Sequence, residues 1–443
     1  MRSMLLLAGA VAALSGPAMA QVPASPSTLA DLRAAIAADY DANLGALWEH
    51  LHRNPELSTL EVQTAARMAE ELRALGYDVT TGVGGHGVVA VLRNGPGPTV
   101  MLRADMDGLP IREETGLPYA STATQVDVDG VEKPVMHACG HDVHMAALIG
   151  AARQMMARRD AWSGTLVLIG QPAEEGVRGA RAMLEDGLYT RFPKPDYALG
   201  FHVKAGLPVG HVQVPEAIAY SSSDSLNMTV RGIGGHGASP HMTVDPVVIA
   251  SYIVVALQTL RSREISPLEG AVVTVGSIHG GSRSNIIPDQ VELQLTLRAD
   301  SPEVREHLRA GVERIARNTA LALNAPEDRL PIVTQPSPGV PPVINDTPLA
   351  LRLRDVLADG MGEGVLVSPP RTSMGAEDFA LYGQPETGVK AVFMDVGGAA
   401  PDHLAEAAPH HSSHFRIEPR PAVTTGVEAM VRSAMSLLPK RSE

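Results

Sequence analysis

The sequence predicts an α/β protein, in which a domain with a mostly parallel sheet covered by helices is interrupted by a smaller inserted domain of ferredoxin-like βαββαβ order. Two observations predict this fold. Uncharged strand segments such as 165–170 and 196–200 are separated by helical segments, which is typical of a sheet covered on both faces. Between residues 222 and 335 the segments instead follow the order strand, helix, strand, strand, helix, strand.

The first part of the chain begins with helices. Residues 31–76 are helical with a break at Asn54-Pro55, and Gly76 closes the second helix, predicted at 58–75. The other predicted elements of this part are strands 87–93, 99–102, 165–170 and 196–200 and helices 143–158 and 176–186. The helix from 143 is apolar on nearly all sides, so we expect it to be buried.

The inserted domain and the segment after it complete the expected architecture. Asp245-Pro246 and Ser301-Pro302 have the cap and first-turn residues that start helices. The predicted elements are strands 224–231, 271–278, 290–298, 331–335 and 390–395 and helices 245–263, 301–324, 346–361 and 419–438, with a proline-rich linker at 335–342. We therefore predict one catalytic domain in two pieces, 31–221 and 336–443, and an inserted domain at 222–335.

The composition is that of a globular protein without a nucleic-acid partner. Hydrophobic residues make up 44% of the 443 residues and charged residues 19%, a balance normal for a globular chain. The formal net charge is -13, and no basic stripe is present that would displace counterions from phosphates. No later stretch approaches the roughly 20 unbroken apolar residues of a membrane span. We therefore expect neither nucleic-acid binding nor membrane insertion.

The N-terminus has the pattern of an export signal. Arg2 gives a positive start, residues 4–14 are apolar, and Ala18-Met19-Ala20 is a small-x-small cleavage pattern. The sequence thus predicts a signal peptide at 1–20 and a disordered leader, rich in Pro, Ser and Ala, at 21–30. We expect an exported protein, either periplasmic or secreted.

Metal-binding residue types occur where the predicted strands end. Asp105 and Asp107 follow strand 99–102, Glu174 and Glu175 follow strand 165–170, and His202 follows strand 196–200. Ligands of open α/β sheets bind beyond the carboxyl ends of strands, and charged groups at a buried edge are costly unless they are paired or bound to metal. The sequence therefore predicts a metal site at this edge, near Cys139 and His141.

The spacing of these residues suits two metal ions. Cys139, the single cysteine, and His141 are two residues apart, so in extended chain they point the same way and reach one site. A thiolate can bridge two divalent ions. Glu174 and Glu175 are adjacent and point in different directions, which suits one metal ligand and one general base. The spacing leaves open which glutamate has which role.

Each feature has a plainer interpretation when it is taken alone. A lone cysteine is commonly a buried core residue, and an adjacent glutamate pair is usually solvated. Asp105 and Asp107 also suit a turn, and His202 also suits a core histidine. Because these residue types occur together on successive strands, their joint pattern favours a metal site.

Motifs along the chain resemble the M20 metallopeptidase family, in particular its amidohydrolase branch of hippurate hydrolases, auxin-conjugate hydrolases and bacterial aminoacylase-like carboxypeptidases. They span nearly all of the predicted mature chain in family order. The motifs are Arg103–Asp107, His137–Asp142, Gln171–Glu175, Gly200–Val203, Gly234–His236, Asn285–Pro288, Glu377–Phe379 and His411–Phe415. The resemblance implies a catalytic domain interrupted by a small lid domain, often used for dimerisation.

The resemblance also implies two divalent metal ions. Cys139 would bridge them, and the other ligands would be His141, Glu175, His202 and His411. The C-terminal ligand is open between His410 and His411, which stand side by side, and Ser413 occupies a position where the family usually has Pro. This donor set accepts zinc, manganese, cobalt or nickel, so the sequence does not select the metal.

Further roles follow from the same resemblance. Glu174 would be the general base, and His236 in the lid would stabilise the oxyanion, often across a dimer interface. Asn285 would touch the carboxylate end of the substrate. The residues expected to orient ligands from behind are Asp105, Asp107 and Asp142. The role of the typical pair Glu377 and Asp378 stays open.

The expected activity is hydrolysis of the amide bond of N-acyl amino acids, such as hippurate-like conjugates, by a metal-activated water. An exported dipeptidase or carboxypeptidase, or an N-acyl-diaminopimelate deacetylase, would use the same site. A hypothesis from another class is a non-catalytic binding protein without metal. No G-x-S-x-G motif indicates a serine nucleophile. The expected partners are a small N-acyl amino acid or short peptide and a second copy of the chain, bound through the lid.

Overall fold

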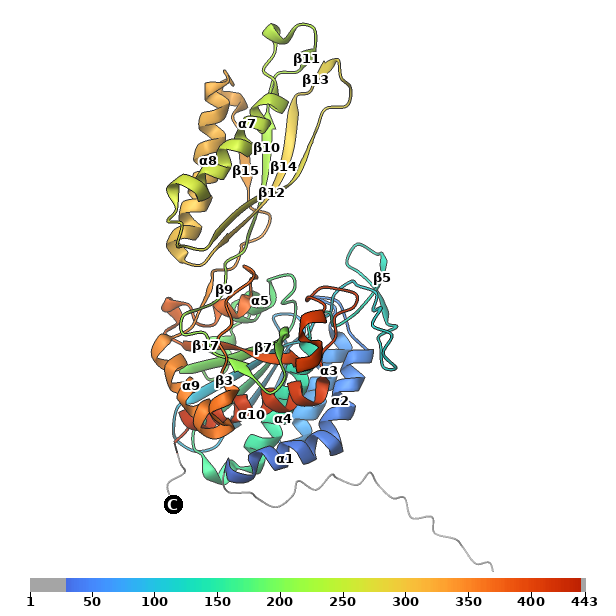
Figure 1. Cartoon of the computed structure of the whole chain (residues 1–443), viewed down its shortest axis with the longest axis vertical. Coiled ribbons are helices and arrows are strands. Elements are labelled where there is room, and N and C mark those ends of the chain that lie inside the picture. The colour runs from blue at the N-terminus through green and yellow to red at the C-terminus, as the bar shows by residue number, and fades with distance from the viewer. Residues whose placement is uncertain (1–28, 440–443) are drawn as a thin grey trace, which may run out of the picture.

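The computed structural model describes residues 29–439 and shows two units of unequal size (Figure 1). The predicted signal peptide, 1–20, and most of the predicted leader, 21–30, lie outside the described residues. Leu29–Asp31 forms a short 3-10 helix, so the last two residues of the leader are helical rather than disordered. Among residues 29–439, no helix combines the length and the apolar character that a membrane span requires.

The larger unit contains elements from both ends of the chain. Before the smaller unit these are α1 (Leu32–Asp39), α2 (Gly45–Arg53), α3 (Val62–Ala74), β1 (Asp78–Val83), β2 (Gly87–Arg93), β3 (Thr99–Asp105), β4 (Thr124–Val126), β5 (Glu132–Pro134), α4 (His141–Ala157), β6 (Thr165–Gln171), α5 (Gly179–Glu185), α6 (Leu188–Arg191), β7 (Tyr197–Pro208), β8 (Val212–Gln213) and β9 (Ile218–Tyr220). After it come β16 (Val343–Ile344), α9 (Thr347–Met361), β17 (Lys390–Ala399) and α10 (Pro419–Leu437).

Parallel strands form the centre of the larger sheet, whose order is β1-β2-β6-β3-β7-β17-β8. β3 pairs in parallel with β6 and β7, and β7 pairs in parallel with β17, while β1, β2 and β8 add antiparallel edges. The structure confirms the predicted α/β class with a mostly parallel, helix-covered sheet. Because the central strands are parallel, the carboxyl ends of β3, β6 and β7 meet at one edge.

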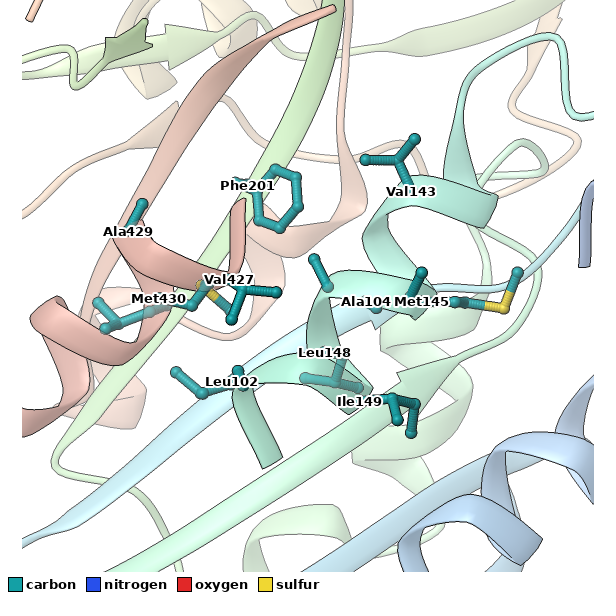
Figure 2. Packing of buried hydrophobic residues seen from close by; sticks show 14 of the residues in the cluster. Leu102, Ala104, Val143, Met145, Leu148, Ile149, Phe201, Val427, Ala429 and Met430 are labelled. Atoms are coloured by element: carbon teal, nitrogen blue, oxygen red, sulfur yellow. The ribbon is translucent and has the colours of Figure 1, made fainter. Parts of the chain in front are cut away.

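Alternate residues of the central strands face two different cores. In β3, Val100 and Leu102 belong to the core shared with α4 and α10, whereas Met101 belongs to the core on the opposite face. Figure 2 shows residues of β3, α4, β7 and α10 meeting in the first core, among them Leu148 and Phe201. α4 is buried on nearly all sides, in line with its apolar sequence.

The smaller unit has a separate sheet and a separate core. Its elements are β10 (Asp224–Arg231), β11 (Gly235–His236), α7 (Pro246–Thr259), β12 (Ala271–Gly280), β13 (Ile286–Ile287), β14 (Gln290–Ala299), α8 (Pro302–Ala322) and β15 (Ile332–Thr334). The sheet order is β12-β14-β10-β15 with antiparallel neighbours, and α7 and α8 pack on it around one core (Figure 1). The Asp245 carboxylate caps α7 by accepting the backbone N–H groups of Val247 and Val248, with Pro246 at the first position.

Several local predictions differ from the structure; the strand predicted at 196–200, for example, is β7 and runs to Pro208. The helix predicted at 176–186 begins only at Gly179, because the chain turns tightly after β6, with positive φ values at Ala173 (52°) and Val177 (48°). The helix predicted from residue 58 begins at Val62. The antiparallel strand β1 was not predicted, since its sequence, DVTTGV, has no clear apolar periodicity.

Replacement of Leu148 by Ala tests the packing of α4 against the sheet. Leu148 is buried in the core with β3 and α10, so the truncation leaves a cavity and should lower the free energy of unfolding by about 2–5 kcal/mol. Leu351→Ala in α9 is the matched control, because that side chain is 44% exposed and should change stability by less than about 1 kcal/mol. Urea unfolding of the metal-free proteins measures both, and equal effects would contradict the packing.

Candidate active site

The carboxyl edge of the larger sheet gathers the predicted metal ligands. Cys139 Sγ lies 3.3 Å from His202 Nε2. His411 Nε2 lies 3.3 Å from one carboxylate oxygen of Glu175, and His141 Nε2 lies 3.9 Å from the other. These side chains come from the loop before α4, the start of α4, the turn after β6, strand β7 and the loop before α10. The structure therefore brings together residues that are far apart in the sequence.

Cys139 lies at the centre of this cluster. Its sulfur lies within 4.8 Å of potential ligand atoms of His202 and His410 in one group, and of Glu175 and His411 in another. The sequence left the C-terminal ligand open between His410 and His411. Both histidines reach the cluster, but each belongs to a different group of donor atoms. A thiolate that borders two groups of donors fits a bridge between two cations.

The cluster concentrates acidic groups in a buried space. Burial, together with Glu175 and Glu174, raises the pKa of the Cys139 thiol well above its usual range. Burial and the neighbouring carboxylates of Glu377 and Glu175 also raise the pKa of Glu174 strongly. The pKa of Glu175 rises to about 7, mainly through burial. Without cations, these groups are therefore driven toward their neutral forms.

Unpartnered atoms in the same space agree with cation binding. His141 Nε2 and Glu175 Oε1 are buried and have no hydrogen-bond partner. Sulfur, imidazole nitrogen and carboxylate oxygen are all donors that divalent transition metals accept. The residues present therefore fit divalent ions, which would satisfy the open donor atoms and offset the acidic charge.

Asp107 contacts the site residues from behind. Its backbone carbonyl accepts Nδ1–H of His141 at 2.7 Å, which leaves Nε2 of the ring facing the cluster. Its carboxylate accepts the backbone N–H groups of Glu174 at 3.1 Å and Glu175 at 3.0 Å, and the hydroxyl of Ser58 at 2.5 Å. One residue thus fixes both the turn after β6 and the orientation of a candidate ligand.

Asp105 joins three elements beneath the cluster. Its carboxylate accepts Nδ1–H of His144 at 2.5 Å and a guanidinium N–H of Arg103 at 2.6 Å. His144 Nε2 in turn accepts the backbone N–H of Val203 at 2.8 Å, which links α4 to β7. Sequence reasoning missed His144, although it follows His141 by three residues and therefore shares its face of α4.

Arg103 is a buried cation next to the predicted base. Its guanidinium pairs with Glu377 at 2.8 Å and with Asp378 at 3.2 Å. Carboxylate oxygens of these two acids lie within 4.8 Å of one on Glu174. Burial raises the pKa of Glu377 to about 8 and that of Asp378 to about 6, and Arg103 opposes both shifts. Glu377 and Asp378, whose role the sequence left open, thus contact Arg103 and lie beside Glu174.

Asp142 was expected to orient a metal ligand, but its side chain contacts other groups. Its carboxylate accepts the backbone N–H of Val143 at 2.9 Å and contacts His52 Nδ1 at 2.7 Å, rather than the side chain of a candidate ligand. His52 also lies 3.3 Å from Glu113. Burial lowers the pKa of His52, but Asp142 and Glu113 outweigh it and raise the value to about 9. Asp142 therefore ties the start of α4 to α2 through a charged histidine.

The loop before α10 carries two histidines with different surroundings. His411 has a positive φ of 64°, and its backbone N–H donates to the carbonyl of Ala138 at 2.9 Å. The neighbouring His410 is mostly enclosed, its Nε2 accepts the backbone N–H of Ala205 at 3.4 Å, and burial lowers its pKa to about 3. The turn at His411 thus lets the two rings face different parts of the cluster.

His236 and Asn285 lie together, but away from the cluster of their own chain. β11 pairs with β13, and the backbone N–H of Gly237 donates to the carbonyl of Asn285 at 2.9 Å. His236 and Asn285 are both exposed residues. Figure 1 shows β11 and β13 at the tip of the smaller unit, at the end remote from the larger unit. Within one chain, these two predicted residues therefore do not join the metal-type cluster.

Comparison with known proteins identifies the family. The model described as Peptidase family M20/M25/M40 matches residues 101–436. The chain is 37% identical over 338 residues to N-acetyl-L-cysteine deacetylase of Bacillus subtilis (strain 168), which covers 75% of this chain and 76% of that protein. It is 35% identical over 348 residues to hippurate hydrolase of Campylobacter jejuni, which covers 78% of this chain and 86% of that protein.

A solved structure agrees in both fold and sequence. It is the YXEP protein of Bacillus subtilis, described as a dinuclear metal binding peptidase from the M20 family. The TM-score is 0.74 and the identity 29%, over 90% of this chain and 99% of that chain. The chain therefore belongs to peptidase family M20/M25/M40 and is a metal-dependent amidohydrolase.

Proposed function

We propose that this amidohydrolase cleaves the amide bond of N-acyl amino acids, such as hippurate-like conjugates, with two divalent ions and Glu174 as the general base. The observation that carries the proposal is the position of Cys139 Sγ, which borders two groups of donor atoms beside the buried Glu174. The activities named for the relatives, deacetylation of an N-acetyl amino acid and hydrolysis of hippurate, support the same reaction class.

The donor groups suggest how the ions are shared. Cys139, Glu175 and His411 would hold one ion, since their ligand atoms form one compact group. Cys139 and His202, which are in contact and group with His410, would hold the other, with His141 as the family resemblance implies. When bound, the ions lower the pKa of the attacking water and polarise the scissile carbonyl. Zinc, manganese, cobalt and nickel all suit this donor set.

The contacts of the two glutamates support a division of roles. Glu175 lies with Cys139 and His411, whereas Glu174 lies with Glu377 and Asp378. Each glutamate has one carboxylate oxygen 3.9 Å from His141 Nε2. The Asp107 carboxylate accepts the backbone N–H of Glu174 and so restricts where the Glu174 carboxylate can lie. Glu174 accepts a proton from the attacking water as the C–O bond forms, and donates it to the amide nitrogen as the C–N bond breaks. The products are a carboxylic acid and an amino acid.

Glu174→Gln tests the general base. The amide cannot accept the water proton, so kcat for hippurate should fall by about 10²–10⁴-fold, while the ligands stay in place and bound metal is retained. Hydrolysis rates and elemental analysis of the purified variant measure the two quantities. Glu185→Gln is the matched control, because Glu185 is exposed on α5.

Three outcomes separate the hypotheses about the site. Full activity in Glu174→Gln would remove this residue from the mechanism. Wild-type protein that holds little metal and turns over no substrate would favour a non-catalytic binding protein. If dipeptides or N-acyl-diaminopimelate are cleaved faster than N-acyl amino acids, the site is the same but the proposed substrate class is wrong.

We also propose that the active form is a homodimer joined through the smaller unit. Strands β11, which contains His236, and β13, which follows Asn285 directly, lie at its tip, at the end remote from the larger unit (Figure 1). The exposed face of α7 carries Val248, Tyr252 and Val255, which are 44%, 60% and 71% exposed. Residues at this spacing share one helix face, and an exposed apolar stripe is typical of a binding surface. A second copy on this face would supply His236 to stabilise the oxyanion and Asn285 to bind the substrate carboxylate.

Mixing two inactive variants tests whether His236 acts between chains. His236→Ala should lose about 10²–10³-fold in kcat, as expected for one oxyanion donor. In a mixed dimer with Glu174→Gln, one site combines an intact base with an intact His236 from the other chain. Hydrolysis should therefore return when the two variants are mixed under conditions that permit subunit exchange.

The complementation has its own controls. Each variant mixed with itself should stay inactive, and Tyr252→Glu introduced into both should prevent both recovery and dimer formation, as measured by light scattering. Asn318→Glu adds the same charge to an exposed position of α8 and should leave the dimer intact. If the mixture stays inactive although mixed dimers form, His236 does not act across the interface.

We further propose that the protein is exported and loses residues 1–20. The charged start, apolar run and Ala18-Met19-Ala20 pattern support this. Mass spectrometry of the protein recovered outside the cytoplasm should find Gln21 as the first residue. An uncleaved protein confined to the cytoplasm would contradict export.

A further inference from the structure

We propose that Glu114 is a positioning residue for the metal ligand His411, and that the ion held by Cys139, Glu175 and His411 is the exchangeable one of the pair. This inference rests on the proposed function, because it assumes the ligand assignment given above. It adds a residue outside the ligand set and a difference between the two ions.

The proposed ligands differ in their exposure to solvent. The side chain of His411 is 54% exposed. His141, by contrast, is fully buried, and His202 and Cys139 are 7% and 8% exposed. An ion that depends on His411 is therefore bound through a ligand at the protein surface, whereas the ligands of the other ion are enclosed. Loss and uptake of metal should be easier on the side of His411.

His411 also occupies a backbone conformation that needs support. Its φ of 64° lies in the left-handed region, which is unfavourable for a residue with a Cβ atom. Such a conformation persists only where the surrounding structure holds it. On the N-terminal side, the backbone N–H of His411 donates to the carbonyl of Ala138 at 2.9 Å. The residues that follow His411 contact a second segment of the chain, at Glu114.

Glu114 makes three hydrogen bonds to the residues that follow His411. Its backbone N–H donates to the carbonyl of Ser413 at 2.8 Å. Its carboxylate accepts the hydroxyl of Ser413 at 2.8 Å, and its backbone carbonyl accepts Nδ1–H of His414 at 2.9 Å. All three bonds are made to Ser413 and His414, which follow His411 by two and three positions. Glu114 therefore acts on this ligand through the backbone of the loop.

The side-chain bond is the part that mutation can remove. Glu114→Ala deletes the acceptor for the Ser413 hydroxyl, together with the carboxylate oxygen that lies 3.9 Å from His414 Nε2, and leaves both backbone bonds possible. Glu114→Gln keeps an acceptor oxygen in the same place and should behave nearly as the wild type. Glu70→Ala removes an exposed carboxylate from α3 and serves as the charge-matched control. Glu114 is itself exposed, so these changes should leave the fold intact.

Titration of the metal-free proteins with Zn²⁺ in a competing chelator tests the proposal. The wild type should bind two ions in two steps of unequal affinity. Glu114→Ala should weaken the weaker step by about tenfold, in the range typical of residues that orient metal ligands, and should leave the tighter step unchanged. The urea midpoint of the metal-free variant should match that of the wild type, which excludes general destabilisation.

The outcomes distinguish this inference from the proposed function. If Glu114→Ala leaves both steps unchanged, or weakens both equally, Glu114 does not position His411. If the wild type binds two ions with one common affinity, the exchangeable-ion assignment is wrong. If the wild type binds no metal and cleaves no N-acyl amino acid, the proposed function fails and this inference fails with it.

Discussion

Acidic side chains buried together at one sheet edge are the constraint on which the rest of the structure depends. Burial disfavours ionisation of Cys139, Glu174 and Glu175, and the Glu175 carboxylate adds to this effect on the other two. Arg103, a buried cation nearby, is already paired with carboxylates beneath them. Such groups ionise together only if further positive charge joins them. Bound metal ions supply that charge, so formation of this edge and metal binding are linked.

The fold meets this constraint with parallel strands and one tight turn. Parallel pairing places the ends of β3, β6 and β7 at one edge, and α4 begins there with His141. The turn after β6 carries Ala173 with positive φ, and its backbone N–H donates to the buried carboxylate of Glu61 at 2.8 Å. Because of this turn, Glu174 and Glu175 lie in different groups of side chains, which supports the division of roles that we propose for them.

The sequence predicts those parts of the site that follow strands, because chain order and sheet geometry together place them. It does not predict contacts between distant segments. Arg103 meets Glu377 across 274 positions, and Glu114 meets Ser413 across 299. Periodicity carries no information about such pairs. The helix predicted at 176–186 includes the last residues of the turn after β6, because local preference does not reveal the tertiary contact of Ala173. Residue spacing also did not reveal that His236 lies remote from its own cluster.

The metal content of Cys139→Ala, compared with the wild type, tests the central claim most directly. Both donor groups share the Cys139 sulfur, so its removal should abolish stable binding of both ions at once rather than of one. Elemental analysis after reconstitution and gel filtration gives the metal bound per chain. A variant that retains as much metal as the wild type would show that this thiolate does not join the two groups, and the account of the site would be wrong.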